Sequence, residues 1–196
     1  EQLEEIVLRA KEEIEKDEAK ELQFYELESK VRESLPALRQ EYMQFLIRYS
    51  TPESKVKAKW EFLEVDLDLN QLAVMVVEMD DFETKYSSRT AAEVELIRFS
   101  SFNILEETVQ ASTKGIVIKE QISRLIIIFN EIEREATEVL AEACRRNIEQ
   151  FAKHVTVSIG VGNTVNRIEQ LPESYQNALQ ALSQNFFVGG NSVFFF

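Results

Sequence analysis

The sequence predicts a mixed α/β fold in which a five-stranded mixed sheet with flanking helices follows a long N-terminal coiled-coil helix. Residues 1–33 contain no proline or glycine and place apolar side chains three, four or seven residues apart, which is typical of a helix with a partner-facing stripe. From residue 72 onward, short apolar runs alternate with segments of helical periodicity. This alternation predicts one domain of strands and helices.

Length and charge limit the functions that the chain can have. With 196 residues and 44% hydrophobic content, one sizeable core and a helical extension are expected. We divide the chain into a linker helix (1–35), a helical bridge (36–66) and a globular domain (67–196). A formal charge of −13 repels phosphate backbones and anionic membranes. We therefore expect neither direct nucleic-acid binding nor membrane binding.

The expected cellular location follows from the lack of a membrane span, a signal peptide and a pair of cysteines. No run approaches the roughly 20 apolar residues that span a bilayer, and no charged-then-apolar signal peptide opens the chain. A single cysteine, Cys144, cannot form an internal disulfide. We expect a cytoplasmic protein. The first residue is not methionine and the last four are apolar, so the sequence is expected to be part of a longer chain.

The N-terminal helix is expected to pair with a second copy of the chain. The apolar stripe consists of Leu3, Ile6, Ala10, Phe24, Leu27 and Val31. Residues 15–21 are nearly all charged and weaken its middle. The alternative is an amphipathic helix packed on its own domain, but 33 residues would extend roughly 50 Å, longer than such a domain is wide. Projection and self-association are therefore favoured.

Proline marks the expected boundaries of the bridge. Ser34, Leu35 and Pro36 should interrupt the first helix, since proline lacks an amide hydrogen and disfavours helical geometry before it. A second helix should follow. Thr51 is expected to cap a third helix, with Pro52 at its first position, that ends near residue 64.

The globular domain should alternate strands and helices. The expected strands cover residues 72–79, 115–119, 124–129, 155–161 and 193–196. The expected helices run from about 89 to 111, from a cap at Asn130 to about 151, and from Pro172 to about 186. A hairpin between the second and third strands would make the sheet partly antiparallel.

Three features that could carry chemistry have a simpler structural explanation. Cys144 and the only histidine, His154, lack further ligands at the spacing of a zinc site or a nucleophile pair, so we expect a structural role for both. The pair Gly160 and Gly162 lacks the third glycine of a dinucleotide site. We expect these glycines to let a strand end and turn.

Several motifs resemble the GGDEF-type nucleotidyl cyclase fold. They are residues 72–83 (Leu-Ala-Val-Met-Val-Val-Glu-Met-Asp-Asp-Phe-Glu), 155–162 (Val-Thr-Val-Ser-Ile-Gly-Val-Gly), 171–182 (Leu-Pro-Glu-Ser-Tyr-Gln-Asn-Ala-Leu-Gln-Ala-Leu) and 186–191 (Phe-Phe-Val-Gly-Gly-Asn). More closely, over residues 22–196, the chain resembles the degenerate GGDEF-like middle domain of YesN-type response regulators. The resemblance implies a receiver domain and an AraC-type DNA-binding domain in the parent chain, and a relay or dimerisation element here.

The resemblance also implies that the cyclase site is vestigial. Glu78 corresponds to the first ligand of the divalent cation, with Asp80 beside it. Gln121 and Ile122 replace the glycines of the hairpin, and Ser123 and Arg124 replace its two acids. An arginine offers no lone pair to a cation. Tyr86 and Ser87 replace a nucleotide-contacting Asn-Asp pair, and residues 112–115 replace the Arg-x-x-Asp product-inhibition motif. We therefore expect no catalysis, metal or cofactor.

Three functions remain in competition. The leading hypothesis is a non-catalytic dimerisation and signal-relay module. The second is a ligand-sensing domain that binds a nucleotide or small anion in the former cyclase cleft, where Arg124 would attract the anion. The third is residual cyclase activity through Glu78. Glu78, Asp80 and Asp81 would otherwise be strand-end acids solvated by water.

Overall fold

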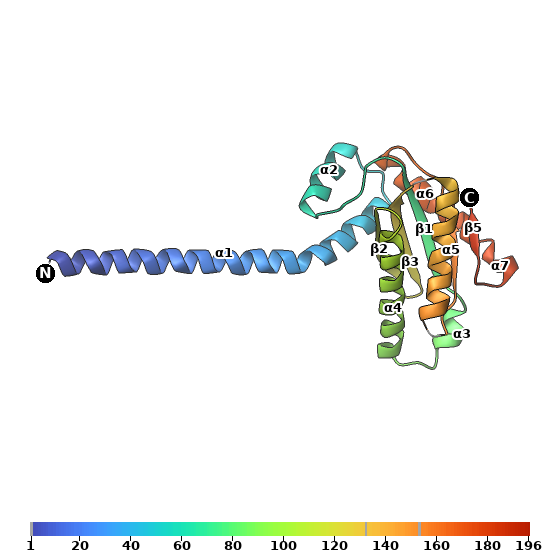
Figure 1. The fold of residues 1–196 in the computed structure, drawn as a ribbon, viewed down its shortest axis with the longest axis horizontal. Helices are drawn as coiled ribbons and strands as arrows, with labels where there is room; N and C mark the ends of the chain where they lie inside the picture. The colour runs from blue at the N-terminus through green and yellow to red at the C-terminus, as the bar shows by residue number, and fades with distance from the viewer. Residues whose placement is uncertain (1, 132, 153) are drawn as a thin grey trace. The chain divides into compact units, whose positions relative to one another are not determined.

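The computed structural model describes residues 2–131, 133–152 and 154–196, except the side chains of residues 2–8, 10 and 12. The chain forms two compact units, Glu1–Arg39 and Gln40–Phe196 (Figure 1). Unit 1 is helical throughout its described residues. Unit 2 contains the end of the same helix and all remaining elements.

The first helix, α1 (Gln2–Leu46), continues through Pro36. The predicted interruption at Ser34, Leu35 and Pro36 is therefore wrong. A proline inside a helix removes one backbone hydrogen bond, but packing holds the residues after it in place: Met43 is fully buried and Gln40 bonds to a strand through its side chain. Tertiary contacts outweigh the local preference of proline.

The short helix α2 (Glu53–Phe62) starts at the predicted place with a different cap. Pro52 is the N-cap residue, whereas the Thr51 hydroxyl donates to the carbonyl of Tyr49 at 3.0 Å. The predicted cap at Thr51 is therefore wrong. The helix buries Val56 and Trp60 and ends two residues before the predicted end.

The five strands are β1 (Leu72–Met79), β2 (Gly115–Gln121), β3 (Arg124–Asn130), β4 (Val157–Val161) and β5 (Val193–Phe195). They form one sheet in the order β2-β3-β1-β4-β5. Only the pair β4–β5 is parallel. The predicted five-stranded mixed sheet is confirmed, and β1 occupies its centre, which explains the apolar run over its first six residues.

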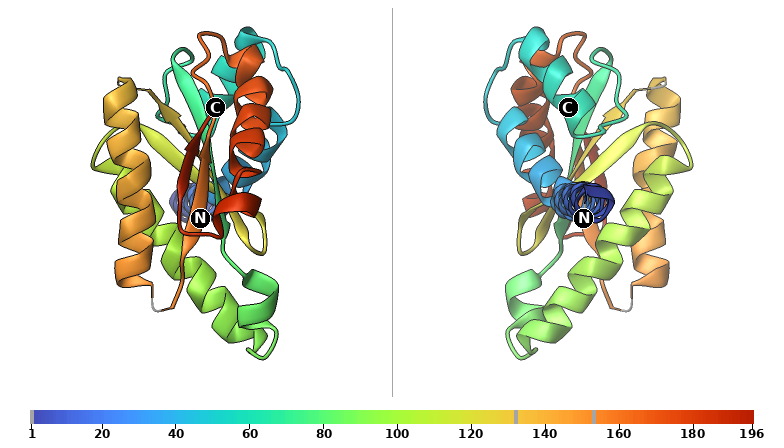
Figure 2. Two further views of the ribbon diagram at one scale, coloured as in Figure 1. Left: turned by 90° about the vertical axis from the view of Figure 1, so that its right-hand side faces the viewer. Right: turned by 90° about the vertical axis from the view of Figure 1, so that its left-hand side faces the viewer.

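Helices cover both faces of this sheet (Figure 2). Alternate residues of β1, such as Met75 and Val77, pack on one face with α4 (Ala91–Gln110) and α5 (Arg134–Phe151). The intervening residues, such as Val74 and Val76, pack on the other face with α6 (Leu171–Leu182) and the end of α1. This two-residue alternation is the pleat of a strand that is buried on both sides.

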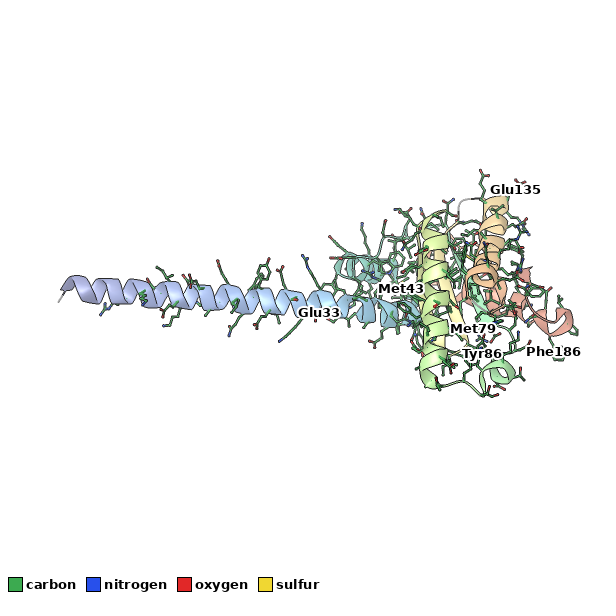
Figure 3. The ribbon with its side chains drawn as sticks, turned by 60° about the horizontal axis from the view of Figure 1, so that its bottom comes forward. Glu33, Met43, Met79, Tyr86, Glu135 and Phe186 are labelled. Atoms are coloured by element: carbon green, nitrogen blue, oxygen red, sulfur yellow. The ribbon has the colours of Figure 1, made fainter. Side chains whose placement is uncertain are left out.

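Two predicted helix limits differ from the structure. Asn130 is the last residue of β3, and its side chain accepts from the amide of Asp68 and donates to the carbonyl of Asp68. It does not cap α5, which begins at Arg134 after Glu133. The last predicted helix stops at Leu182 and is followed by the separate turn α7 (Asn185–Val188). The Phe186 side chain points away from the sheet (Figure 3). The remaining short elements are α3 (Phe82–Tyr86) and the 3-10 turn η1 (Ile168–Gln170).

The two glycines around β4 allow α6 to approach the sheet. A Cβ atom on Gly160 would fall well inside van der Waals contact of the Ala178 carbonyl oxygen, and one on Gly162 would crowd Ser174. Neither glycine has a positive φ. β4 ends at Val161, directly before Gly162, as predicted, whereas Gly160 lies inside the strand. At both positions the missing side chain allows close packing of helix on strand.

Candidate functional site

The candidate site lies where β1 ends beside the β2–β3 hairpin. The amide of Met79 donates to the carbonyl of Ser123 at 2.9 Å and ties the strand end to the hairpin. An open pocket of about 580 Å³ lies at this junction. Its lining consists of Glu78, Met79, Asp81, Phe82, Glu83, Thr84, Gln121, Ile122 and Ser123. The fold thus brings together four of the predicted site residues, namely Glu78, Gln121, Ile122 and Ser123.

Arg124 bonds to Glu78 at the edge of this pocket. The two residues are directly opposite each other in the antiparallel β1–β3 pair, and Arg124 Nη2 lies 2.9 Å from Glu78 Oε1. Burial alone would lower the pKa of Arg124, but the carboxylates of Glu78 and Glu120 outweigh it and raise the pKa. The arginine therefore stays charged and neutralises the acid that the resemblance assigns to a cation.

A second carboxylate, that of Glu120 on β2, lies close to the guanidinium of Arg124. Its side chain is only 3% exposed. Glu120 accepts from the Tyr175 hydroxyl of α6 and from Arg48 Nη2, and Arg124 Nη1 lies 3.7 Å away. Burial, followed by the bond to Glu120, raises the pKa of Tyr175 to about 12, so the hydroxyl keeps its proton. Sequence reasoning missed Glu120 because Lys119, Glu120 and Gln121 together look like a solvated strand end.

Asp80 does not line the pocket and instead holds the loop that precedes β5. Its carboxylate accepts from the Ser158 hydroxyl at 2.6 Å, from the Asn191 amide at 2.8 Å and from the Asn185 side chain at 3.5 Å. Asp81, by contrast, is exposed and pairs with Lys85 at 3.4 Å. The expectation that these acids are solvated by water is therefore wrong for Asp80, and also for Glu78.

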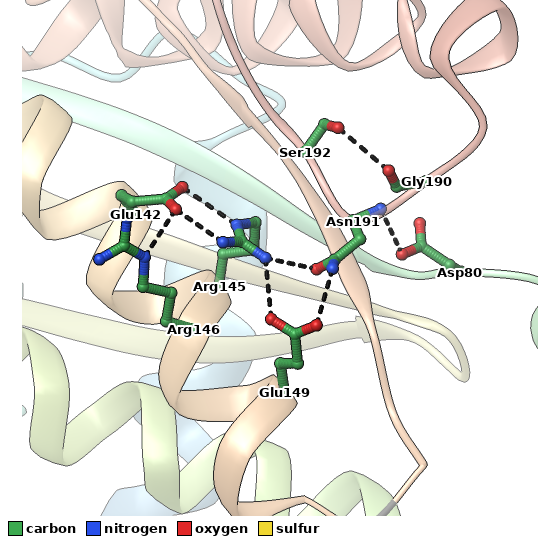
Figure 4. Close-up of polar contacts among 8 residues, drawn as sticks. All are labelled: Asp80, Glu142, Arg145, Arg146, Glu149, Gly190, Asn191 and Ser192. Carbon is green, nitrogen blue, oxygen red and sulfur yellow. Dashed lines mark hydrogen bonds and ion pairs between the residues drawn. The ribbon is translucent and has the colours of Figure 1, made fainter.

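The loop that Asp80 holds is also bound to α5 (Figure 4). Arg145 donates to the Asn191 side chain at 2.7 Å, and that side chain donates to Glu149 at 3.0 Å. Arg145, and to a lesser degree Arg146, hold the pKa of Glu142 below its usual value. Asp80 and α5 thus fix the same loop, which gives Asp80 a structural role.

The chemistry open to the site is limited. In the part of the chain that the structure describes, no group of three or more His, Cys, Asp or Glu side chains could hold a metal ion. Cys144 is fully buried, and burial raises the pKa of its thiol to about 12, so the reactive thiolate is not formed near neutral pH. The expected structural role of Cys144 is consistent with this burial.

The predicted stripe on α1 is only partly described. Phe24, Leu27 and Val31 are exposed in the single chain, whereas the side chains of Leu3, Ile6 and Ala10 lie outside the described residues. The three described members of the stripe therefore leave apolar surface in contact with solvent in a single chain. Among the described residues, no helix is long and apolar enough to cross a membrane.

Comparisons with known proteins agree with this architecture. The coiled coil and GGDEF domain of DgcB from Caulobacter crescentus, solved with c-di-GMP, is similar with a TM-score of 0.59 at 14% identity, over 91% of this chain and 98% of that chain. The diguanylate cyclase SiaD from Pseudomonas aeruginosa, solved with its activator SiaC, has a TM-score of 0.58 at 11% identity, over 99% and 80%. The active GGEEF domain of a Vibrio cholerae diguanylate cyclase has a TM-score of 0.55 at 16% identity, over 70% and 87%.

At these identities the likeness is one of fold. No curated protein matches the sequence. The sequence profile described as "GGDEF-like domain", however, matches residues 48–183, which include β1, the β2–β3 hairpin, β4 and α6. The chain therefore belongs to the GGDEF-like domain family.

Proposed function

We propose that this chain is a non-catalytic dimerisation and signal-relay module of a cytoplasmic two-component response regulator. In the parent chain it would link a receiver domain to an AraC-type DNA-binding domain. The stripe on α1 would pair with a second copy. The GGDEF-like domain would pass the state of the receiver on without turning over a nucleotide.

The bond between Arg124 and Glu78 is the observation that carries this proposal. A cyclase site needs acidic oxygens to hold the cation that bridges the triphosphate. Here Glu78, the acid that the resemblance assigns to the cation, is bonded at 2.9 Å to the guanidinium of Arg124 from the hairpin. A cation at this position would meet a positive charge and would have to break a charge-assisted hydrogen bond.

Calorimetric titration tests the absence of nucleotide chemistry. We expect no saturable heat with GTP or with cyclic di-GMP in the presence of magnesium, and no pyrophosphate release from GTP. The absence of a saturable heat at about 100 micromolar protein excludes a dissociation constant below about 1 mM, which corresponds to a binding free energy of roughly −4 kcal/mol. An active diguanylate cyclase in the same assay is the positive control. Pyrophosphate release that disappears in Glu78→Gln would overturn the proposal.

Light scattering tests the dimer. We expect the wild-type chain to be a dimer at tens of micromolar and Leu27→Glu to be a monomer, because a charge in a helix seam must be buried without a partner. Leu22→Glu is the matched control, because the side chains of Leu22 and Leu27 are similarly exposed, at 65% and 62%. The two residues are five positions apart in the helix, which places them on different faces. A monomeric wild type, or equal loss of dimer in both variants, would contradict the proposed pairing.

The pocket supports a second candidate, a ligand-sensing domain. Its volume of about 580 Å³ is within the range of ligand sites. The described lining residues include three acids, Glu78, Asp81 and Glu83, and no Lys, Arg or His. Such a lining disfavours an anion, and Arg124 is already engaged by carboxylates. A thermal shift with spermidine, but not with GTP, that is lost in Glu78→Gln would favour this sensor over the relay.

A further inference from the structure

Arg124 lies between two carboxylates and bonds to only one of them. Its Nη2 atom bonds to Glu78 Oε1 at 2.9 Å, whereas its Nη1 atom lies 3.7 Å from Glu120 Oε2. Among the described residues, two buried atoms of this group lack a hydrogen-bond partner: Glu120 Oε2 and Arg124 Nε. Buried polar atoms are rarely left unpaired. The arginine thus has an unmade bond within a small movement of its present position.

Arg48 is a second cation beside Glu120. Its Nη2 atom lies 3.3 Å from Glu120 Oε1 and supplies a positive charge next to the buried carboxylate. The Tyr175 hydroxyl donates to the same oxygen but carries no charge. Without Arg48, the carboxylate would have Arg124 as its only cationic neighbour among the described residues. A buried charge without a partner is strongly unfavourable, so Arg124 would be drawn toward Glu120.

Arg48 lies two residues after the end of α1, and its amide donates to the carbonyl of Phe45 in that helix. Gln40 bonds to Lys119 of β2 twice: its side-chain oxygen accepts from the Lys119 amide at 2.9 Å, and its nitrogen donates to the Lys119 carbonyl at 2.7 Å. The Gln44 side chain donates to the same carbonyl. Gln40 and Gln44 lie one helical turn apart on α1 and both contact Lys119 of β2. Arg48, in the turn that follows α1, contacts Glu120 of the same strand. A rotation or shift of the end of α1 would therefore change the contacts of Gln40 and Gln44 with Lys119 and, through the turn that follows, the contact of Arg48 with Glu120.

We propose that Arg124 is a two-position switch that couples the end of α1 to the pocket at Glu78. With Arg48 on Glu120, Arg124 stays on Glu78 and neutralises its carboxylate. With Arg48 withdrawn, Arg124 moves to Glu120 and Glu78 is released into the pocket. Two discrete positions of one side chain provide the two-state element that coupling requires. This inference rests on the proposed relay function, because α1 would be the source of the movement.

The variant Arg48→Met in the full chain tests the switch. In its crystal structure we expect Arg124 to contact Glu120 within hydrogen-bond distance and to leave Glu78. In solution, we expect the Met79 amide, which donates to Ser123, to exchange its hydrogen at least about fivefold faster, the lower end of typical coupling. Arg134→Met is the control, since Arg134 is an exposed arginine paired with Glu138 at 3.6 Å.

Reciprocity gives a second readout. Because coupling acts equally in both directions, Arg124→Met should change exchange at the amides of Arg48 and Tyr49, which donate to Phe45. If Arg48→Met does not fold, the double variant Gln40→Ala, Gln44→Ala releases the helix end and should accelerate exchange at Met79 similarly.

An Arg124 side chain that stays on Glu78, with Met79 exchange unchanged, would overturn the switch. It would leave the relay standing, because light scattering on the wild type decides the dimer independently. Conversely, if the wild type is a monomer and Arg124 moves as proposed, the dimeric relay is contradicted, and the coupling between α1 and the pocket acts within one chain.

Discussion

Asp80→Ala is expected to lower the free energy of unfolding by about 3 kcal/mol, as expected for the loss of a buried charged acceptor that leaves donors unpaired. The Asp80 carboxylate is the acceptor for the buried Ser158 hydroxyl and for the Asn191 amide. Alanine would orphan both donors. Urea unfolding monitored by circular dichroism measures the difference.

Asp81→Ala is the matched control for this prediction. The neighbouring acid is 66% exposed, and among the described residues its carboxylate pairs with Lys85. Asp81 has a φ of 51°, which aspartate tolerates better than alanine, so its removal should cost no more than about 1 kcal/mol. Asp80→Ala should also speed chymotrypsin cleavage at the exposed Phe186, because the loop that follows α7 loses its anchor. Equal effects of the two substitutions would show that Asp80 has no special structural role.

Gly160→Ala is expected to destabilise the domain by about 3 kcal/mol, the upper part of the range for overpacked cores. The added Cβ would overlap the Ala178 carbonyl oxygen and lie 2.7 Å from the Leu182 amide nitrogen. Both are backbone atoms, so no side-chain rotation relieves the overlap. The helix cannot retreat cheaply, because α6 buries Leu171 and Ala178 against the sheet.

Gly189→Ala separates this packing cost from a conformational one. Gly189 has a φ of 91°, and a Cβ atom added to it would have no neighbouring atom within 4 Å. Alanine there therefore costs only the left-handed backbone, about 1 kcal/mol. Thermal unfolding of both variants makes the comparison. A smaller loss for Gly160→Ala than for Gly189→Ala would contradict the close-packing account of β4 and α6.

The strands could be predicted because their signal is local. Residues 72–77 are a continuous apolar run, and β1 covers the predicted residues 72–79 in the structure. The helix limits depended on distant partners. Pro36 does not break α1, because the residues after it pack on the sheet. Asn130 caps no helix, because its side-chain amide is hydrogen-bonded to the backbone of Asp68. Neither partner can be read from neighbouring residues.

The site was predicted in position but not in bonding. The resemblance placed Glu78 and Arg124 near each other, but only the register of β1 and β3 makes them directly opposite. Asp80 looked like a solvated acid because its partner Asn191 is 111 residues away. Glu120 gave no signal at all, since its burial depends on Tyr175 and Arg48, which come from separate elements.

The end of α1 has a consequence for handling the protein. β2 is an edge strand, and the side-chain amides of Gln40 and Gln44 occupy both the amide and the carbonyl of Lys119. An uncovered strand edge with apolar residues invites pairing with other molecules. A chain shortened to begin after residue 48 would expose that edge beside Ile116 and Ile118. Such a chain should precipitate, whereas one that retains Gln40 and Gln44 should stay dispersed.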